Sequence, residues 1–234
     1  MATKEKQRKL CSVKLEDLPD EVILKVLGNL GMEDLFVCAQ LSRRFKCVSQ
    51  DEYLWIKMNI SLRKLPMSYL QQALDNGCKY LSLYHSRIRA GISDDFILKK
   101  SCQLRYLDFS FCKAFDDCVL GTILTSCNSL QKLSLARIRN ISLDMMNGIC
   151  NKNSSTITTL DLCSARFSEW EFQTIIKHCD KLTELNLSYT DLSREDIIFL
   201  VTNLTETIEN LNLASIKGIY QVCSFLPYLK ASLI

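Results

Sequence analysis

A short apolar pattern recurs six times along the chain at a nearly constant period. In each copy, apolar residues occupy the first, fourth and sixth positions, and the copies begin at Cys78, Leu104, Leu130, Ile157, Leu182 and Ile208. These first positions lie 26, 26, 27, 25 and 26 residues apart. Six consecutive copies at this spacing predict a repeat array in which each unit packs on its neighbours. Such an array presents an extended surface, which favours binding over catalysis.

Each repeat is predicted to contain a short strand, a turn and a helix. The helices are expected at roughly 93–101, 116–126, 142–150, 168–178 and 193–203, with serine N-caps at Ser93, Ser142, Ser168 and Ser193. The apolar core and the repeat length are those of leucine-rich repeats. The predicted fold class is therefore α/β, with a leucine-rich-repeat solenoid over residues 78–234, strands on its concave face and helices on its convex face.

The array is expected to hold about six repeats and an incomplete seventh. The stretch from Phe225 to Lys230 begins a further copy, but Ser232 stands where the second apolar core residue is expected. No polar capping unit follows, although an open solenoid end exposes its core. A shortened isoform, a divergent paralogue and a fragment all fit this pattern.

Residues 17–60 form a separate block whose apolar residues recur at helical spacing. Pro19 suits the first position of a helix that Gly31 ends in a left-handed conformation. Ser42 is expected to cap a third helix and Asp51 a fourth. The apolar residues of these helices are Val22, Ile23, Val26, Leu27 and Leu30, then Leu35, Cys38 and Leu41, then Phe45 and Val48, and finally Leu54, Trp55 and Met58.

The flanking segments and the composition complete the domain prediction. Residues 1–16 are expected to be a disordered basic tail, and residues 61–77 an amphipathic linker helix bearing Met67, Leu70, Ala73 and Leu74. The hydrophobic fraction of 47% and charged fraction of 24% are those of a folded soluble protein. A net charge of +3 gives no support for nucleic-acid binding. With no apolar run of roughly 18 residues, we expect no membrane span and a location in the nucleus and cytoplasm.

Catalytic, metal and cofactor sites are not predicted. The chain has 12 cysteines but no C-x-x-C pair, so we expect reduced thiols that pack in the core rather than a zinc site. His85 and His178 have no nucleophile or carboxylate at motif spacing. No glycine-rich phosphate loop is present. The sequence therefore predicts a protein that is not an enzyme and needs no cofactor.

The N-terminal block resembles an F-box. The resemblance rests on Leu18-Pro19-Asp20-Glu21-Val22-Ile23, on Leu41-Ser42-Arg43-Arg44-Phe45 and on Asp51-Glu52-Tyr53-Leu54-Trp55, with Phe45 where the family usually has Trp. An F-box followed by repeats of about 26 residues is the layout of the F-box/leucine-rich-repeat family. The resemblance implies a substrate-recognition subunit of an SCF-type ubiquitin ligase. The F-box would dock on the Skp adaptor, which connects it to a cullin and its RING subunit, and the repeats would hold a protein substrate for ubiquitination and proteasomal degradation.

The adaptor contact implied by this resemblance is an apolar one. The residues expected to make it are Leu18, Pro19, Ile23, Leu24, Leu27, Leu30, Leu35, Leu41 and Trp55. The alternative is that these residues form the core of the block itself. For so small a unit both apply in part, and for Trp55 the two are equally favoured.

Two columns of residues are candidates for the substrate surface. If Leu107 and Phe109 point into the core, Tyr106, Asp108 and Ser110 point outward, and so do their equivalents in the other repeats. The middle column of this face is small and polar: Ser82, Asp108, Ser134, Asp161, Asn186 and Asn212. Such a column can bind a peptide, or its side chains can bond one another.

The second column stands four residues after each last core position. It is basic at five of six places: Arg87, Lys113, Arg139, Arg166, Asp191 and Lys217. The hypothesis is that this rim recognises an acidic or phosphorylated segment, and the alternative is a solvated loop edge. The candidate substrate-binding residues are thus Tyr84, Tyr106 and Asp108 together with the five cations.

A second function stays open at this point. A truncated F-box protein could act as a decoy or regulator that occupies the adaptor without delivering substrate, and the incomplete C-terminal repeat favours this alternative. A repeat scaffold with a vestigial F-box is disfavoured by Leu18-Pro19 and Trp55.

Overall fold

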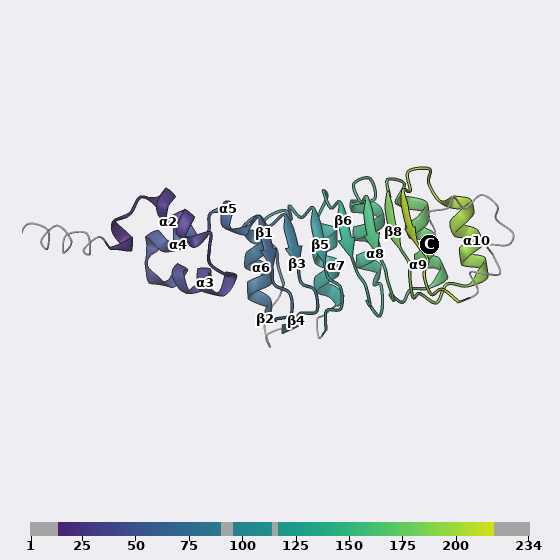
Figure 1. Cartoon of the computed structure of the whole chain (residues 1–234), viewed down its shortest axis with the longest axis horizontal. Coiled ribbons are helices and arrows are strands. Elements are labelled where there is room, and N and C mark those ends of the chain that lie inside the picture. Colours follow the sequence, from purple (N-terminus) through teal and green to yellow (C-terminus); the bar gives the residue numbers. More distant parts are fainter. Residues whose placement is uncertain (1–13, 90–95, 114–116, 218–234) are drawn as a thin grey trace, which may run out of the picture. The chain divides into compact units, whose positions relative to one another are not determined.

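The computed structural model describes residues 14–89, 96–113 and 117–217 (Figure 1). The chain divides into two compact units, Met1–Ile56 and Lys57–Ile234, and each is described by itself. The predicted tail up to residue 13, Ser93 with the start of its helix, and the incomplete seventh repeat lie outside the described residues.

The N-terminal unit is helical. After a single 3-10 turn, η1 (Leu15–Asp17), it contains α2 (Asp20–Leu27), α3 (Met32–Leu41), α4 (Arg43–Ser49) and α5 (Glu52–Trp55). Two predicted caps are confirmed: Ser42 Oγ accepts a hydrogen bond from the Phe45 amide at 3.2 Å, and Asp51 Oδ1 accepts one from the Tyr53 amide at 2.9 Å. Both satisfy amides that have no partner in the first turn of a helix.

The core of this unit forms around Trp55. Its side chain is 1% exposed, its indole Nε1 donates to the Ser49 carbonyl at 2.7 Å, and the Phe36 ring meets it edge-on at 5.9 Å. The indole thus has both apolar neighbours and a partner for its one donor, as a buried Trp requires. The other large core side chains are Ile23, Leu27, Leu35, Phe45 and Leu54.

The first helix differs from its prediction at both ends. Pro19 is the N-cap rather than the first helical residue, and α2 ends at Leu27. Gly31 has a φ of −74°, so it is not a left-handed stop; it is the N-cap of α3. Val22 and Val26, expected on the apolar face, are about two-fifths exposed.

The second unit is built on a seven-stranded sheet in which every pairing is parallel. Its spatial order is β1-β3-β5-β6-β7-β8-β9, so each strand pairs with the one from the next repeat. The bounds are β1 (Lys57–Asn59), β3 (Tyr80–Ser82), β5 (Tyr106–Asp108), β6 (Lys132–Ser134), β7 (Thr159–Asp161), β8 (Glu184–Asn186) and β9 (Asn210–Asn212). A two-stranded parallel sheet joins β2 (Lys64–Pro66) to β4 (Arg87–Arg89).

Helices pack along one side of this sheet (Figure 1). They are α6 (Met67–Asp75), α7 (Asp117–Ser126), α8 (Leu143–Asn147) with a π-helical turn η2 (Gly148–Lys152), α9 (Glu169–His178) and α10 (Arg194–Asn203). The predicted fold class is confirmed: a helical N-terminal unit precedes a parallel α/β region consistent with a leucine-rich-repeat-like solenoid. In the described segments, no helix is long and apolar enough to cross a membrane.

The helical caps of the repeats also follow the prediction. Ser142 Oγ accepts from the Met145 amide, while Ser168 and Ser193 each form a capping box with an acidic residue three positions on. Between α7 and η2 the backbones lie so close that a Cβ at Gly148 would stand 2.4 Å from Leu124 Cβ. Only glycine fits at this contact.

The repeat array begins earlier than predicted. Met58 lies in β1, not in the fourth helix of the N-terminal block, and pairs in register with Leu81. The chain carries the same core spacing here, with Trp55, Met58 and Ile60 at the first, fourth and sixth positions. The prediction missed this copy because its first residue is Trp rather than an aliphatic residue or Cys.

Two predicted helices are also wrong in part. The linker helix starts at Met67 instead of residue 61, because Lys64–Pro66 pair with the second sheet and Pro66 is the N-cap. No helix forms over the described residues 96–101. This segment is held on α6 instead, where Asp75 Oδ1 accepts from the Lys99 amide at 2.8 Å and Gln71 Nε2 donates to the Ile97 carbonyl at 2.5 Å.

Candidate functional site

The nine candidate adaptor residues divide by exposure. Ile23, Leu27, Leu35 and Trp55 are at most 2% exposed and belong to the core of the N-terminal unit. The other five have surface available to a partner: Leu18, Leu24 and Leu30 are half-buried, Pro19 is exposed, and Leu41 is 63% exposed. The buried four can therefore act on a partner only by shaping the surface that the other five present.

Additional apolar side chains, not predicted as adaptor contacts, are exposed on the same unit. Val22 and Val26 lie one turn apart on α2, and Val37 lies one turn before Leu41 on α3. Tyr53 on α5 is also exposed. Exposed apolar residues paired at helical spacing on two helices are typical of a surface that another protein covers.

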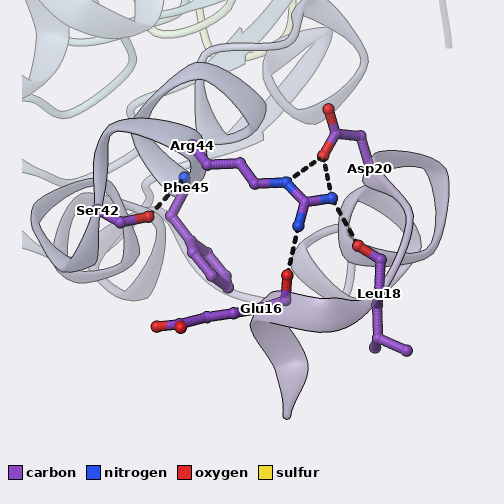
Figure 2. Close-up of polar contacts among 6 residues, drawn as sticks. All are labelled: Glu16, Leu18, Asp20, Ser42, Arg44 and Phe45. Carbon is purple, nitrogen blue, oxygen red and sulfur yellow. Dashed lines mark hydrogen bonds and ion pairs between the residues drawn. The ribbon is translucent and has the colours of Figure 1, made fainter. Parts of the chain in front are cut away.

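Arg44 fixes the segment that carries Leu18 and Pro19 (Figure 2). Its Nε donates to Asp20 Oδ1 at 2.7 Å, its Nη2 donates to the Leu18 carbonyl at 2.6 Å, and its Nη1 donates to the Glu16 carbonyl. Nη2 also forms an ion pair with Asp20 Oδ1 at 2.6 Å. One guanidinium fork on α4 thus ties together η1, the Leu18–Pro19 segment and the first turn of α2. The sequence motif includes Arg44, but nothing in its spacing indicates this role.

The middle polar column of the repeats is bonded largely to itself. Ser82 Oγ donates to Asp108 Oδ2 at 3.1 Å, and Ser134 Oγ donates to Asp161 Oδ2 at 3.0 Å. The second carboxylate oxygens of Asp108 and Asp161 each accept a backbone amide two residues on. A substrate would have to compete with these bonds.

The outermost column of the strand face does not follow the predicted alternation. Ser110, Ala136 and Ser188 are buried, although Tyr84 and Ala214 in the same column are exposed. The hydroxyls fold back into the polar column: Ser110 Oγ lies 2.6 Å from Ser134 Oγ, and Ser188 Oγ donates to Asn186 Oδ1 at 2.8 Å. The alternation ends here because the next residue in each repeat turns the chain with a positive φ.

The remaining strand-face candidate, Tyr106, is half-buried on β5. Burial, and then the nearby carboxylates of Asp108 and Asp161, raise the pKa of its phenol. The phenol therefore stays neutral at physiological pH and can offer a hydrogen bond.

The basic column lies along one edge of the array. Lys64 pairs in register with Arg87 across β2 and β4, and Arg87 forms a parallel bridge to Lys113. Further along, the Arg166 amide donates to the Ile138 carbonyl of the preceding repeat at 3.0 Å. All five predicted cations, Arg87, Lys113, Arg139, Arg166 and Lys217, are exposed. Lys64 extends the column by one repeat; the prediction missed it because the repeat that begins at Trp55 was not recognised.

A hollow of about 1090 Å³ borders this column. Lys113, Arg139, Arg166 and Asp191 of the basic column line it. The turn residues two positions before them contribute the other wall: Phe111, Arg137, Ser164 and Tyr189, with His85 from the preceding repeat. Its volume lies just above the range of about 300–1,000 Å³ that is typical of ligand sites.

Among the described cysteines of the repeats, five are buried in the core as expected: Cys78, Cys102, Cys127, Cys150 and Cys179. Cys112, expected in the core as well, and Cys163 are half-buried, and Cys118 is exposed. Cys127 Sγ donates to Cys102 Sγ at 2.8 Å, and this bond together with burial raises the pKa of Cys127. Burial raises the pKa of Cys78 and of Cys112 to about 12. Such thiols stay protonated at physiological pH and make poor nucleophiles or ligands. In the part of the chain that the structure describes, no three His, Cys, Asp or Glu side chains gather as metal ligands.

Comparison with known families identifies the N-terminal unit. Residues 15–61 match the family described as F-box-like. The chain therefore contains an F-box-like domain, which covers the whole described helical unit and the first strand of the sheet. Such a domain implies binding to a Skp adaptor and suggests a substrate-adaptor role in an SCF-type complex. It is typical of the non-catalytic subunits of ubiquitin ligases.

Proposed function

We propose that this protein is the substrate-recognition subunit of an SCF-type E3 ubiquitin ligase. In this proposal the F-box-like domain docks on the Skp adaptor, which links it to a cullin and a RING subunit. The repeat unit captures a protein substrate for ubiquitination and proteasomal degradation, and the chain itself performs no chemistry. The nucleus and cytoplasm are its proposed locations.

The observation that carries the proposal is the Leu18–Pro19 segment within a matched F-box-like domain. The segment lies at the surface and is held by three hydrogen bonds from Arg44 (Figure 2). Exposed apolar residues on α2 and α3 add to it. A surface of this kind suits the apolar, helix-lined contact by which one protein docks on another.

The physical basis of the proposed activity is effective concentration. A receptor that holds a substrate lysine beside a ubiquitin thioester converts a slow bimolecular encounter into a nearly intramolecular one. This requires a scaffold with two separate binding surfaces and no catalytic groups of its own. The F-box-like domain and the exposed edge of the repeats are the two surfaces proposed here.

Within the F-box/leucine-rich-repeat family, the chain looks most like S-phase kinase-associated F-box protein. Three stretches support this finer proposal: Asp51–Trp55, Leu65–Leu74, and Glu206-Thr207-Ile208 ahead of Leu211. The first contains the Asp51 cap, and the second contains α6 up to Leu74. The likeness does not extend to a choice of substrate.

The proposal is tested by affinity purification of the chain beside the double variant Leu18→Ala/Pro19→Ala. Leu143→Ala, which truncates a leucine that is 76% exposed in the repeat unit, serves as the control. We expect wild type and control to retain adaptor, cullin and ubiquitin-conjugating activity, and the double variant to lose all three. Adaptor without cullin would instead support the decoy function, and neither partner on the wild type would refute the adaptor role.

A further inference from the structure

Seven consecutive turns of the repeat unit share a left-handed backbone at a residue that is not glycine. They are Leu62, His85, Phe111, Arg137, Ser164, Tyr189 and Ser215, with φ between 54° and 64°. This conformation is unfavourable for an L-residue, because Cβ comes too close to the following carbonyl oxygen. The cost is offset because each amide from His85 to Tyr189 donates to a carbonyl of the next repeat at 2.8–2.9 Å. The side chains of this turn column therefore project in a row at the spacing of the strands, ~4.8 Å.

The turn column and the basic column together line the hollow described above. Its lining residues carry four positive charges, Lys113, Arg137, Arg139 and Arg166, and two negative ones, Asp117 and Asp191. Among these groups, four minus two leaves an excess of +2. Asp117 belongs to the repeat of Lys113 and Asp191 to the last repeat that lines the hollow, so the three arginines come from the repeats between them.

The three arginines are available to a ligand. Among the described residues, none of them lies within ion-pair distance of a carboxylate, 4.0 Å. Arg137 lies over the Phe111 ring, with its guanidinium carbon 5.4 Å from the ring centroid. That ring packs in turn against Tyr84 at 5.5 Å and His85 at 6.3 Å. The aromatic cluster holds Arg137 in place without neutralising it.

We propose that this hollow binds a phosphorylated serine or threonine in an extended segment of a protein substrate, with the phosphate held by Arg137, Arg139 and Arg166. Three planar guanidinium groups match the three free oxygens of a phosphate monoester. Its charge of about −1.5 to −2 at neutral pH balances the excess of +2. A glutamate offers two oxygens and one charge, and would leave one arginine without a partner.

The negative charges at the two ends of the hollow favour a ligand with a single phosphate over a polyanion. A nucleic acid would bring further phosphates to both ends, where the carboxylates of Asp117 and Asp191 would repel them. A peptide with a single phosphate places neutral or basic residues there. Exposed aromatic surface on Tyr189, which is 63% exposed, can pack against a neighbouring side chain of such a peptide.

That the bound segment belongs to a ligase substrate rests on the proposed function. Its binding to the hollow can be measured without assuming that function. The probe is a degenerate peptide library with one fixed phosphothreonine, compared with the same library carrying threonine or glutamate at that place. The full chain is immobilised by itself, so that peptide binding does not depend on the adaptor. We expect selective retention of the phosphorylated library, and a shared consensus from sequencing the retained peptides.

The test variant is Arg139→Glu/Arg166→Glu. Its control, Arg105→Glu/Lys181→Glu, makes the same change in net charge at exposed residues outside the hollow. Affinity for the consensus phosphopeptide should fall by about tenfold or more in the test variant, since it loses the charge-assisted hydrogen bonds of two of the three arginines. The control should bind as wild type does, and both variants should give the circular dichroism spectrum of wild type.

Several results would overturn the inference: equal retention of the phosphorylated and unmodified libraries, equal losses in both charge-reversed variants, or binding of a single-stranded oligonucleotide as tight as that of the phosphopeptide. Adaptor binding is scored separately with the Leu18→Ala/Pro19→Ala variant. A chain that binds the adaptor but no phosphopeptide refutes only this inference. A chain that binds the phosphopeptide but no adaptor refutes only the ligase role.

Discussion

Replacing Arg44 with alanine tests whether the Leu18–Pro19 segment must be held in place before the adaptor can bind. Arg44 is the one side chain in the described part of the N-terminal unit that reaches η1, the Leu18 carbonyl and α2 at once (Figure 2). Its removal leaves the core untouched, because Arg44 is itself exposed. The segment keeps its sequence and its Pro19, and loses only its attachment to α4.

The expected loss of adaptor affinity follows from how far Arg44 and its hydrogen-bond partners are exposed to water. The Arg44 and Asp20 side chains are 41% and 61% exposed, so their ion pair is screened by water and contributes well under 1 kcal/mol. The two bonds to backbone carbonyls are exposed as well, so each adds only about 0.5 kcal/mol, the lower end of the net range for a hydrogen bond. Together they favour the held conformation by about 1–2 kcal/mol, which is roughly a 5–30-fold change in its population. Adaptor affinity should fall by no more than this factor.

The assay is a titration of the purified adaptor against wild type, Arg44→Ala, Arg44→Lys and Arg43→Ala. Arg43→Ala is the matched control, since Arg43 is the exposed neighbour with the same charge. We expect Arg44→Lys to recover part of the affinity, because an ammonium group cannot reach three acceptors with the geometry of a guanidinium fork. Equal affinities for the two alanine variants would refute the claim that the segment must be held.

Three further predictions concern Asn153 and Cys78, which are both buried in the repeat unit. Asn153→Ala should lower the free energy of unfolding by about 3 kcal/mol in urea titrations, since it removes three buried hydrogen bonds to backbone groups, whereas Asn151→Ala at the exposed neighbour should change it by less than about 0.5 kcal/mol. The pKa of Cys78, raised by burial from 9.0 to about 12, means that the folded state keeps a proton that the unfolded state releases. Stability should therefore fall as the pH rises from about 9 towards 12, and fall less in Cys78→Ala relative to its own value at pH 7. At pH 8 a thiol reagent should modify the exposed Cys47 and spare Cys78 in the folded protein, as mass spectrometry of the labelled peptides can establish.

The N-terminal unit shows what helical periodicity can and cannot predict. The caps at Ser42 and Asp51 follow from side-chain chemistry that acts within four residues, and both are confirmed. The end of α2 was wrong because glycine at position 31 fits a left-handed stop and an N-cap equally well. The bonds of Arg44 span 24 to 28 residues, and no local pattern can reveal contacts at that distance.

In the repeat unit as well, the sequence predicts the contacts that follow from a visible pattern and misses those that do not. The basic column could be predicted because the strands of the six recognised repeats pair in register, so residues 25 to 27 positions apart become neighbours. The positive φ of the turn column could not be predicted, because residues as different as His, Phe, Arg, Ser and Tyr share no property that marks it. Their conformation is imposed by the amide bonds to the next repeat, not by the residue itself. That freedom is what lets such positions carry a binding surface: since the backbone is fixed by its neighbours, side chains there can differ from repeat to repeat without loss of the fold.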